Sequence, residues 1–187
     1  MRTFLSYDIE DQAVISKIGS FQNELLSTGG DLKLVRPEIL HFTVRFLGEI
    51  NEREKEKIVQ ALEGKFPPLE LEVHFEGIGT FPSESKISVI WIGSSEESSK
   101  KLESTAKEIN RLLEKEIDTL PKENLERFNP HVTIARVKSG KNKPRLVEFI
   151  QAHKNEDFGS ARIGSLRLKL SELAPEGPKY QDLHVFP

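Results

Sequence analysis

The chain has 187 residues, with 27 Lys and Arg against 30 Asp and Glu, a formal net charge of −3 and no cysteine. That length fits one large domain or two small lobes, and the missing cysteine excludes disulfides, Cys-ligated zinc and cysteine nucleophiles. The slightly acidic balance argues against a general nucleic-acid coat, which needs a basic excess, but permits the local capture of one or two phosphates.

The first half of the chain alternates between strand and helix patterns. Asn51 can cap a helix, and Glu54 follows it at the spacing of a capping box. The expected elements are a strand over Thr3–Ile9, a helix over Glu10–Ser27, a strand over Leu40–Leu47, a helix from Asn51 to about Leu62, and one or two strands over Leu69–Phe81.

The second half repeats this order. The expected elements are a strand over Lys86–Ile92, a helix over Glu96–Ile117, a strand over Pro130–Val137, a helix from Pro144 to about His153, and a strand region over Ala161–Leu173. Both halves therefore read strand, helix, strand, helix, strand. We interpret the chain as one domain made of two repeats, about 1–84 and 85–187.

Each repeat carries a His-x-Thr sequence on its second strand, His41-Phe42-Thr43 and His131-Val132-Thr133. Residues i and i+2 of a strand point to the same face, so each histidine shares a face with its threonine. The apolar residue between them faces the core. If a pseudo-twofold axis relates the repeats, the two polar pairs can face each other across a cleft.

Two histidines and two hydroxyls suit displacement at phosphorus without a metal ion. An imidazole both gives and takes a proton near neutral pH. One ring can deprotonate the attacking oxygen while the other protonates the leaving oxygen. Threonine hydroxyls can donate hydrogen bonds to the non-bridging phosphate oxygens. Hydrolysis of a strained cyclic phosphodiester fits so small a site, and we expect no metal and no cofactor.

The segments HFTVRFLGE, from His41, and PHVTIARV, from Pro130, resemble the two signature motifs of the two-histidine phosphoesterases. The likeness is strongest to the LigT-like RNA 2′,3′-cyclic phosphodiesterases, also called 2′-5′ RNA ligases. It extends to the segment from Gly77 to Pro82, the strand Ile87 to Ile92, and the region from Leu166 to Tyr180.

This resemblance implies a bilobal α+β fold whose antiparallel sheets face a central cleft. It implies hydrolysis of a 2′,3′-cyclic phosphate on an RNA end, tRNA fragments included, to a 2′-phosphomonoester. By the same resemblance His41 would be the proton donor, His131 the proton acceptor, and Thr43 and Thr133 the phosphate ligands. The residues alone leave the order of donor and acceptor open, and the reverse reaction would make a 2′-5′ linkage.

Three further residues are candidates for substrate binding. Arg45 is in phase with His41 and can reach phosphate or RNA. Arg136 is out of phase with His131 on an ideal strand and reaches the site only if the strand bulges or ends there. Phe81 is either a base-stacking surface or a core aromatic.

Two alternative functions stay open at this stage. One is a module that binds RNA ends without turnover, and the other is a phosphodiesterase acting on 2′-5′-linked oligonucleotides. No apolar run approaches the roughly 20 residues that span a bilayer, and the first dozen residues lack the apolar core of a signal peptide. We expect a soluble, cytoplasmic monomer.

Overall fold

The computed structural model describes residues 1–65, 71–122, 128–175 and 177–187. Helices pack on a large antiparallel sheet in this part of the chain, which confirms the α+β prediction. The elements are β1 (Arg2–Asp8), α1 (Gln12–Ser27), β2 (Leu32–Leu34), the short 3-10 helix η1 (Pro37–Ile39), β3 (His41–Glu49), α2 (Glu52–Leu62), β4 (Leu71–Ser83), β5 (Lys86–Ser94), α3 (Glu96–Glu116), β6 (Val132–Val137), α4 (Lys143–Ala152), β7 (Asp157–Ile163), β8 (Leu166–Ala174) and β9 (Gly177–Val185).

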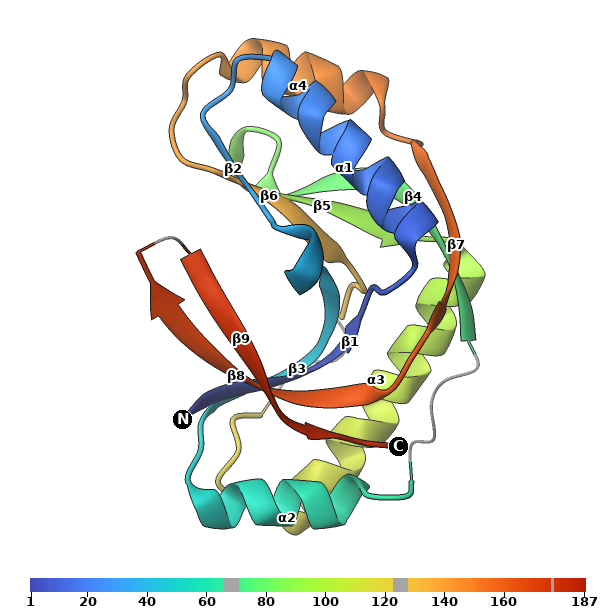
Figure 1. The fold of residues 1–187 in the computed structure, drawn as a ribbon, viewed down its shortest axis with the longest axis vertical. Coiled ribbons are helices and arrows are strands. Elements are labelled where there is room, and N and C mark those ends of the chain that lie inside the picture. Colours follow the sequence, from blue (N-terminus) through green and yellow to red (C-terminus); the bar gives the residue numbers. More distant parts are fainter. Residues whose placement is uncertain (66–70, 123–127, 176) are drawn as a thin grey trace.

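The sheet has the strand order β7-β4-β5-β6-β3-β1-β8-β9, with β2 paired to β6 beside this path. Figure 1 shows it bent into an arch, with α1 and α4 over one end and α2 and α3 at the other. The two antiparallel halves meet where β3 pairs with β6, in a register that places Phe42 opposite Val132. The halves are therefore joined side by side at this seam into one continuous sheet.

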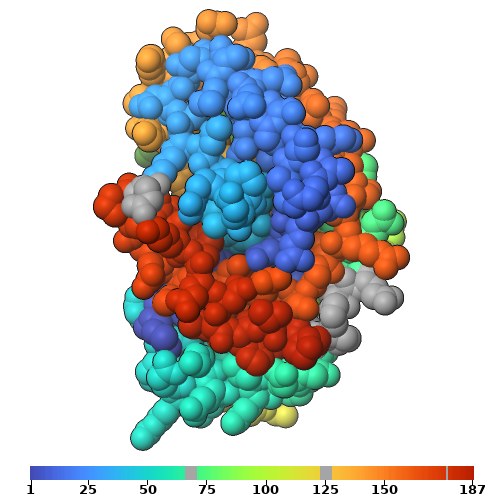
Figure 2. Space-filling model, viewed as in Figure 1, coloured from blue at the N-terminus to red at the C-terminus, as the bar shows by residue number. Residues whose placement is uncertain are grey.

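The two sequence repeats do not coincide with the two halves of the sheet. Strand β4, from the first repeat, pairs with β5 and β7 of the second. Strand β8, from the second repeat, pairs with β1 of the first. The first repeat thus gives β2 and β4 to one half of the sheet, and the second gives β8 and β9 to the other. In Figure 2 the C-terminal strands, in red, cover the middle of the visible face between the segment around β2 and η1 and helix α2.

Helix starts follow the sequence signals closely. The Asn51 side chain accepts from the Glu54 amide and the Glu54 carboxylate accepts from the Asn51 amide, so the predicted capping box is present at the start of α2. Helix α1 begins at Gln12 because Asp11 caps it, with its carboxylate 2.9 Å from the Val14 amide nitrogen. No helix in the described ranges is long and apolar enough to cross a bilayer.

Several strands differ from the prediction. The region Ala161–Leu173 divides into β7 and β8, and β9 follows as a further strand. The short β2 and η1 carry too few residues for a visible period. Residues 69–70 of the strand expected over Leu69–Phe81 lie outside the described residues.

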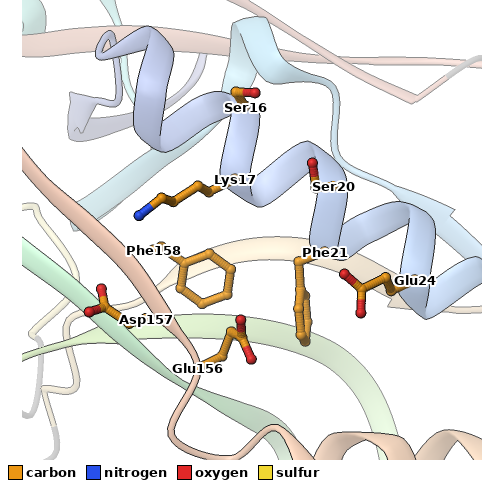
Figure 3. Close-up of a pocket in the computed structure, with 8 residues that line it drawn as sticks. All are labelled: Ser16, Lys17, Ser20, Phe21, Glu24, Glu156, Asp157 and Phe158. Carbon is orange, nitrogen blue, oxygen red and sulfur yellow. The ribbon is translucent and has the colours of Figure 1, made fainter.

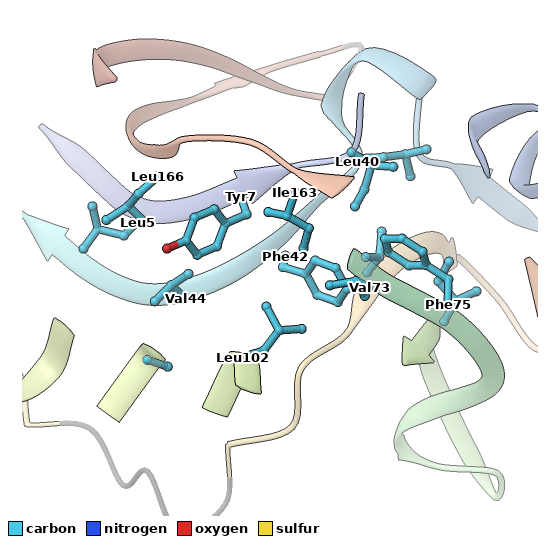
Figure 4. Close-up of a cluster of buried hydrophobic side chains, with 14 of the residues drawn as sticks. Leu5, Tyr7, Leu40, Phe42, Val44, Val73, Phe75, Leu102, Ile163 and Leu166 are labelled. Carbon is cyan, nitrogen blue, oxygen red and sulfur yellow. The ribbon is translucent and has the colours of Figure 1, made fainter. Parts of the chain in front are cut away.

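Part of the apolar core lies between α3 and the sheet, and buried residues of α1, α2 and α4 belong to the same cluster. Figure 4 shows Phe42 of β3 among Val73, Phe75 and Leu102. The rings of Phe42 and Phe75 are stacked with their centroids 5.4 Å apart. Since Phe42 occupies the core face, His41 and Thr43 on either side of it are directed to the opposite face.

Candidate active site

His41 is held at the start of β3 by the backbone just before it. Its Nδ1 lies 2.7 Å from the Ile39 carbonyl oxygen. A carbonyl oxygen can only accept, so Nδ1 carries a proton and donates it. The other ring nitrogen, Nε2, lies 3.2 Å from the Thr43 hydroxyl oxygen. In the neutral ring Nε2 is therefore the nitrogen that is free to take a proton.

His131 repeats this geometry on the neighbouring strand. Its Nδ1 lies 2.7 Å from the carbonyl oxygen of Asn129, again two residues upstream. The same argument places the proton on Nδ1 and leaves Nε2 for proton exchange. His131 and Thr133 are half-buried, as are His41 and Thr43.

The register of the seam brings the four side chains together. Phe42 and Val132 are directly opposite each other on β3 and β6, and both are buried. Adjacent strands lie about 4.8 Å apart, and the residues before and after a core residue point to the other face. His41, Thr43, His131 and Thr133 therefore gather on one face of the sheet, on two neighbouring strands.

Both strands carry a β-bulge after the threonine. Leu5 pairs with Arg45 but Ser6 pairs with Thr43, so β3 has one extra residue between these pairs. Ile90 pairs with Ala135 but Trp91 pairs with Thr133, which gives β6 an extra residue at the same distance from its histidine. A bulge of one residue reverses which face the following side chains occupy.

The bulge in β3 places Arg45 in the interior, which contradicts its predicted role in substrate binding. Its side chain is 0% exposed. The guanidinium donates to the Asn110 side chain and, over 2.8 Å, to the Pro121 carbonyl oxygen. The next residue, Phe46, takes the site face instead and is 62% exposed.

The bulge in β6 brings Arg136 to the site face, the condition on which its predicted role depended. Ala135 is buried and Arg136 is exposed. The bulged Ile134 turns its carbonyl to other partners, the Gln22 side chain at 2.8 Å and the Val35 amide at 2.9 Å. The first motif thus presents an aromatic ring where the second presents a guanidinium.

Among the described residues, each of the two motif histidines, His41 and His131, has two aromatic neighbours. Around His41, the ring centroids of Phe4 and Tyr180 lie 5.1 and 5.3 Å away. Around His131, those of Phe81 and Trp91 lie 4.9 and 5.9 Å away. Phe81 is half-buried and stands edge-on to the His131 ring. It is therefore part of the wall of the site and not of the main core.

Burial governs the protonation of both rings. It lowers the pKa of His41 below the usual value of 6.5, while the Ile39 carbonyl and the Asp8 carboxylate act to raise it and Lys169 and His131 act to lower it. Burial also lowers the pKa of His131, against the opposing effect of the Asn129 carbonyl. The pKa of Tyr180 is raised by burial, and Arg136 is close enough to act in the opposite direction.

Comparison with known proteins places the chain in a family. A family model described as the AKAP7 2′5′ RNA ligase-like domain matches residues 3–184. An RNA 2′,3′-cyclic phosphodiesterase of Archaeoglobus fulgidus is 35% identical, with 100% of this chain and 99% of that protein covered. The chain belongs to the two-histidine phosphoesterase family.

A further relative and two solved structures match over almost their whole length. An RNA 2′,3′-cyclic phosphodiesterase of Methanocaldococcus jannaschii is 35% identical, with 97% of each chain covered. The crystal structure of TT0787 of Thermus thermophilus has a TM-score of 0.81 at 25% identity, over 100% of this chain and 97% of that one. Apo LigT of Escherichia coli shares the fold, with a TM-score of 0.73 at 18% identity over 98% and 95%.

The sequence did not single out three aromatic side chains that contact a motif histidine and a fourth, Phe46, whose ring centroid lies 6.2 Å from that of Phe4. They are Phe4, Phe46, Trp91 and Tyr180. Phe46 is out of phase with His41 on an ideal strand, and only the bulge exposes it. Tyr180 lies on β9, a strand that the hydrophobic pattern did not predict. The aromatic character of these residues was visible in the sequence, but their placement depends on the register.

A separate pocket of about 260 Å³ lies between α1 and the start of β7. Figure 3 shows Lys17, Ser20 and Glu24 of α1 on one side and Glu156 and Asp157 on the other. It contains none of the predicted site residues. Within the described ranges, no three His, Asp or Glu side chains gather in the manner of metal ligands.

Proposed function

We propose that this two-histidine phosphoesterase hydrolyses 2′,3′-cyclic phosphates at RNA ends to 2′-phosphomonoesters. The observation that carries the proposal is the pairing of two His-x-Thr segments on adjacent strands, each ring having Nδ1 fixed and Nε2 available. The names of the archaeal relatives, at 35% identity over nearly the full length, support the same substrate class.

In the proposed reaction, His131 Nε2 takes a proton from a water molecule that attacks the phosphorus atom. The bond between phosphorus and the 3′ oxygen breaks, and His41 Nε2 gives its proton to that oxygen. Each ring is regenerated by proton exchange with solvent. Proton transfer by a positioned group typically contributes about 10²–10⁴-fold to the rate.

The remaining polar groups serve the charge on the phosphate. The Thr43 and Thr133 hydroxyls donate hydrogen bonds to the two non-bridging oxygens, whose negative charge persists through the transition state. Arg136, on β6, adds a charged donor that can bind phosphate with two parallel hydrogen bonds. Phe46 and Phe81 offer flat apolar surfaces for the terminal bases.

The test is product analysis on a short RNA that ends in a 2′,3′-cyclic phosphate. We expect ring opening to a 2′-phosphate, and a loss of at least about 100-fold in His41→Ala and in His131→Ala with the fold intact. His74→Ala is the matched control, because His74 is bound to Ser160 away from the seam. Full activity in either catalytic variant, or release of a 3′-phosphate, would refute the proposal.

The same experiment separates the alternative functions. An RNA-end binding module would hold the cyclic phosphate without opening it. A phosphodiesterase for 2′-5′-linked oligonucleotides would cleave those in preference. The matching family is described as 2′5′ RNA ligase-like, so a 5′-hydroxyl RNA is added in one arm to detect joining by the reverse reaction.

The proposed reaction uses side chains of this chain alone. We therefore expect the rate to be unchanged by excess chelator. A loss of activity that added zinc restores would contradict the metal-free reaction.

A further inference from the structure

A carboxylate lies directly across the strand pair from His41. In the antiparallel register of β1 and β3, Asp8 is the partner of His41. The next pair along, Ile9 and Leu40, is joined by a backbone hydrogen bond of 3.0 Å. Hydrogen-bonded and non-hydrogen-bonded pairs alternate, so Asp8 and His41 form the non-hydrogen-bonded kind, whose side chains share a face and lie close together.

The Asp8 carboxylate is only partly neutralised. Its Oδ2 accepts a hydrogen bond of 2.7 Å from Lys169 Nζ and lies 3.5 Å from Arg167 Nε. Its Oδ1 is buried, with no hydrogen-bond partner among the residues that the structure describes. The side chain is 17% exposed, so the carboxylate keeps a strong local field.

Asp8 belongs to a charged network that carries an excess of one negative charge. Lys169 also lies 3.0 Å from Asp182, and Arg167 lies 2.6 Å from both Asp182 and Glu10. Three carboxylates thus share two cationic side chains, those of Lys169 and Arg167. The network fills the site face of β1, β8 and β9 on the side of His41.

Among the residues that the structure describes, the second histidine has no carboxylate at the corresponding cross-strand position. Ile92 pairs with Val132 across β5 and β6, and the next position toward His131 is Gly93. The two halves of the site are alike in histidine and threonine but differ in this cross-strand residue, aspartate in one and glycine in the other. The difference breaks the symmetry that left the proton donor and acceptor unassigned in the sequence.

We propose that Asp8 is a positioning residue of the site, whose carboxylate stabilises the protonated His41 ring and thereby makes His41, and not His131, the proton donor. This inference rests on the proposed function. A buried imidazole favours its neutral form, which serves a base but not an acid. Asp8 opposes that tendency at His41, and Lys169 limits the effect.

The other groups facing His41 do not supply this charge. Tyr180 from β9 packs edge-on against the ring and is neutral, because burial raises its pKa further above 10.0. His131 from β6 and Lys169 from β8 act to lower the pKa of His41. Thr43 and the Ile39 carbonyl are uncharged hydrogen-bond partners. Among the residues that the structure describes, Asp8 is the anion that acts on the ring.

The test measures the pH dependence of kcat/KM in Asp8→Asn, with the cyclic-phosphate RNA as substrate. Removing the negative charge lowers the pKa of His41. The alkaline limb of the profile, where His41 loses its proton, moves to lower pH by about one unit. At a given pH on that limb, kcat/KM falls roughly tenfold. The acid limb stays in place. In Lys169→Met the alkaline limb moves in the opposite direction, which general damage to the site would not produce.

Glu10→Gln is the matched control, because it removes the same charge from the exposed end of the network, where Glu10 pairs with Arg167. The titration of the His41 ring, followed by NMR in the enzyme without substrate, is readable even if no cyclic phosphate is hydrolysed. An NMR pKa of His41 in Asp8→Asn that shifts no more than in Glu10→Gln would overturn the inference. Failure of the proposed function would instead show as absent turnover with the His41 shift intact.

Discussion

At the scale of single residues, each of the two imidazole rings is held by a hydrogen bond from its Nδ1. Burial lowers the pKa of both rings. In the proposed reaction the base must be unprotonated, and a base with a lowered pKa stays unprotonated down to a lower pH. We therefore expect the acid limb of kcat/KM, set by His131, to lie below pH 6.5, the usual imidazole value. Rates measured between about pH 4.5 and 8.5 check this. An acid limb above pH 6.5 would contradict it.

The two arginines that follow the motifs predict opposite phenotypes. Arg45→Met leaves the Asn110 amide oxygen and the Pro121 carbonyl without their donor, so we expect a loss of about 2–4 kcal/mol in the free energy of unfolding. Arg136→Ala removes an exposed donor beside the proposed phosphate site. We expect unchanged stability and a fall in kcat of about 10²–10³-fold. Denaturant unfolding and turnover are measured on both variants. A stability loss in Arg136→Ala with unchanged stability in Arg45→Met would refute the roles assigned to the two arginines.

The sequence identified His41, Thr43, His131 and Thr133 as a candidate set because strand alternation needs only local information. It misplaced Arg45 because a single extra residue in β3 reverses the phase beyond Thr43. Such a bulge is stabilised by partners that are distant in sequence. In β6, for example, the Gln22 side chain of α1 donates a hydrogen bond to the carbonyl of the bulged Ile134. No local pattern contains that information, so the face occupied by the fifth residue after each histidine could not be read from the motif.

At the scale of elements, the β4–β5 hairpin sets the wall beside His131. Gly79 pairs with Trp91 across the hairpin, and a Cβ on Gly79 would lie 2.0 Å from the indole ring. Gly79→Ala must therefore displace the Trp91 ring, which lies against Phe81 and His131. We expect a loss of about 1–3 kcal/mol in stability together with reduced turnover.

Gly19→Ala is the control for this substitution. Gly19 lies within α1, and its added methyl meets nothing within 4 Å. There the same change should stabilise the protein by about 0.5–1 kcal/mol, because alanine favours the helix. Thermal unfolding and turnover of both variants check the pair. Unchanged turnover in Gly79→Ala would show that Trp91 does not position the site.

Elements with strong local signals were predictable, and those defined by pairing were not. The capping box at Asn51 fixed the start of α2, and the apolar stripe of α3 fixed most of its length. Strand β9 has mostly exposed or half-buried side chains, and β2 has three residues. β9 forms because it pairs with β8, and β2 forms because it pairs with β6. Neither pairing can be predicted from the hydrophobic pattern.

At the scale of the whole molecule, the chain crosses between the two halves of the sheet. The two repeats were predicted from the sequence, but the crossing of β2, β4, β8 and β9 between the halves was not, because pairing between strands distant in sequence has no periodic signature. The crossing places the seam of β3 and β6, and with it both histidines, at the centre of the sheet. The site therefore depends on the complete fold and not on either repeat.

This topology predicts that neither repeat folds alone. In a fragment of residues 1–84, β4 loses both neighbours, β5 and β7, and β1 loses β8. In a fragment of 85–187, β8 loses β1 and β6 loses β3. Each fragment loses these strand pairs and exposes apolar core residues to water, so it should show the narrow amide dispersion of an unfolded chain. The cut falls in the β4–β5 turn, so mixing the fragments allows every strand pair to form again and should restore dispersion and turnover. A well-dispersed spectrum from either fragment alone would show that the repeats are independent lobes.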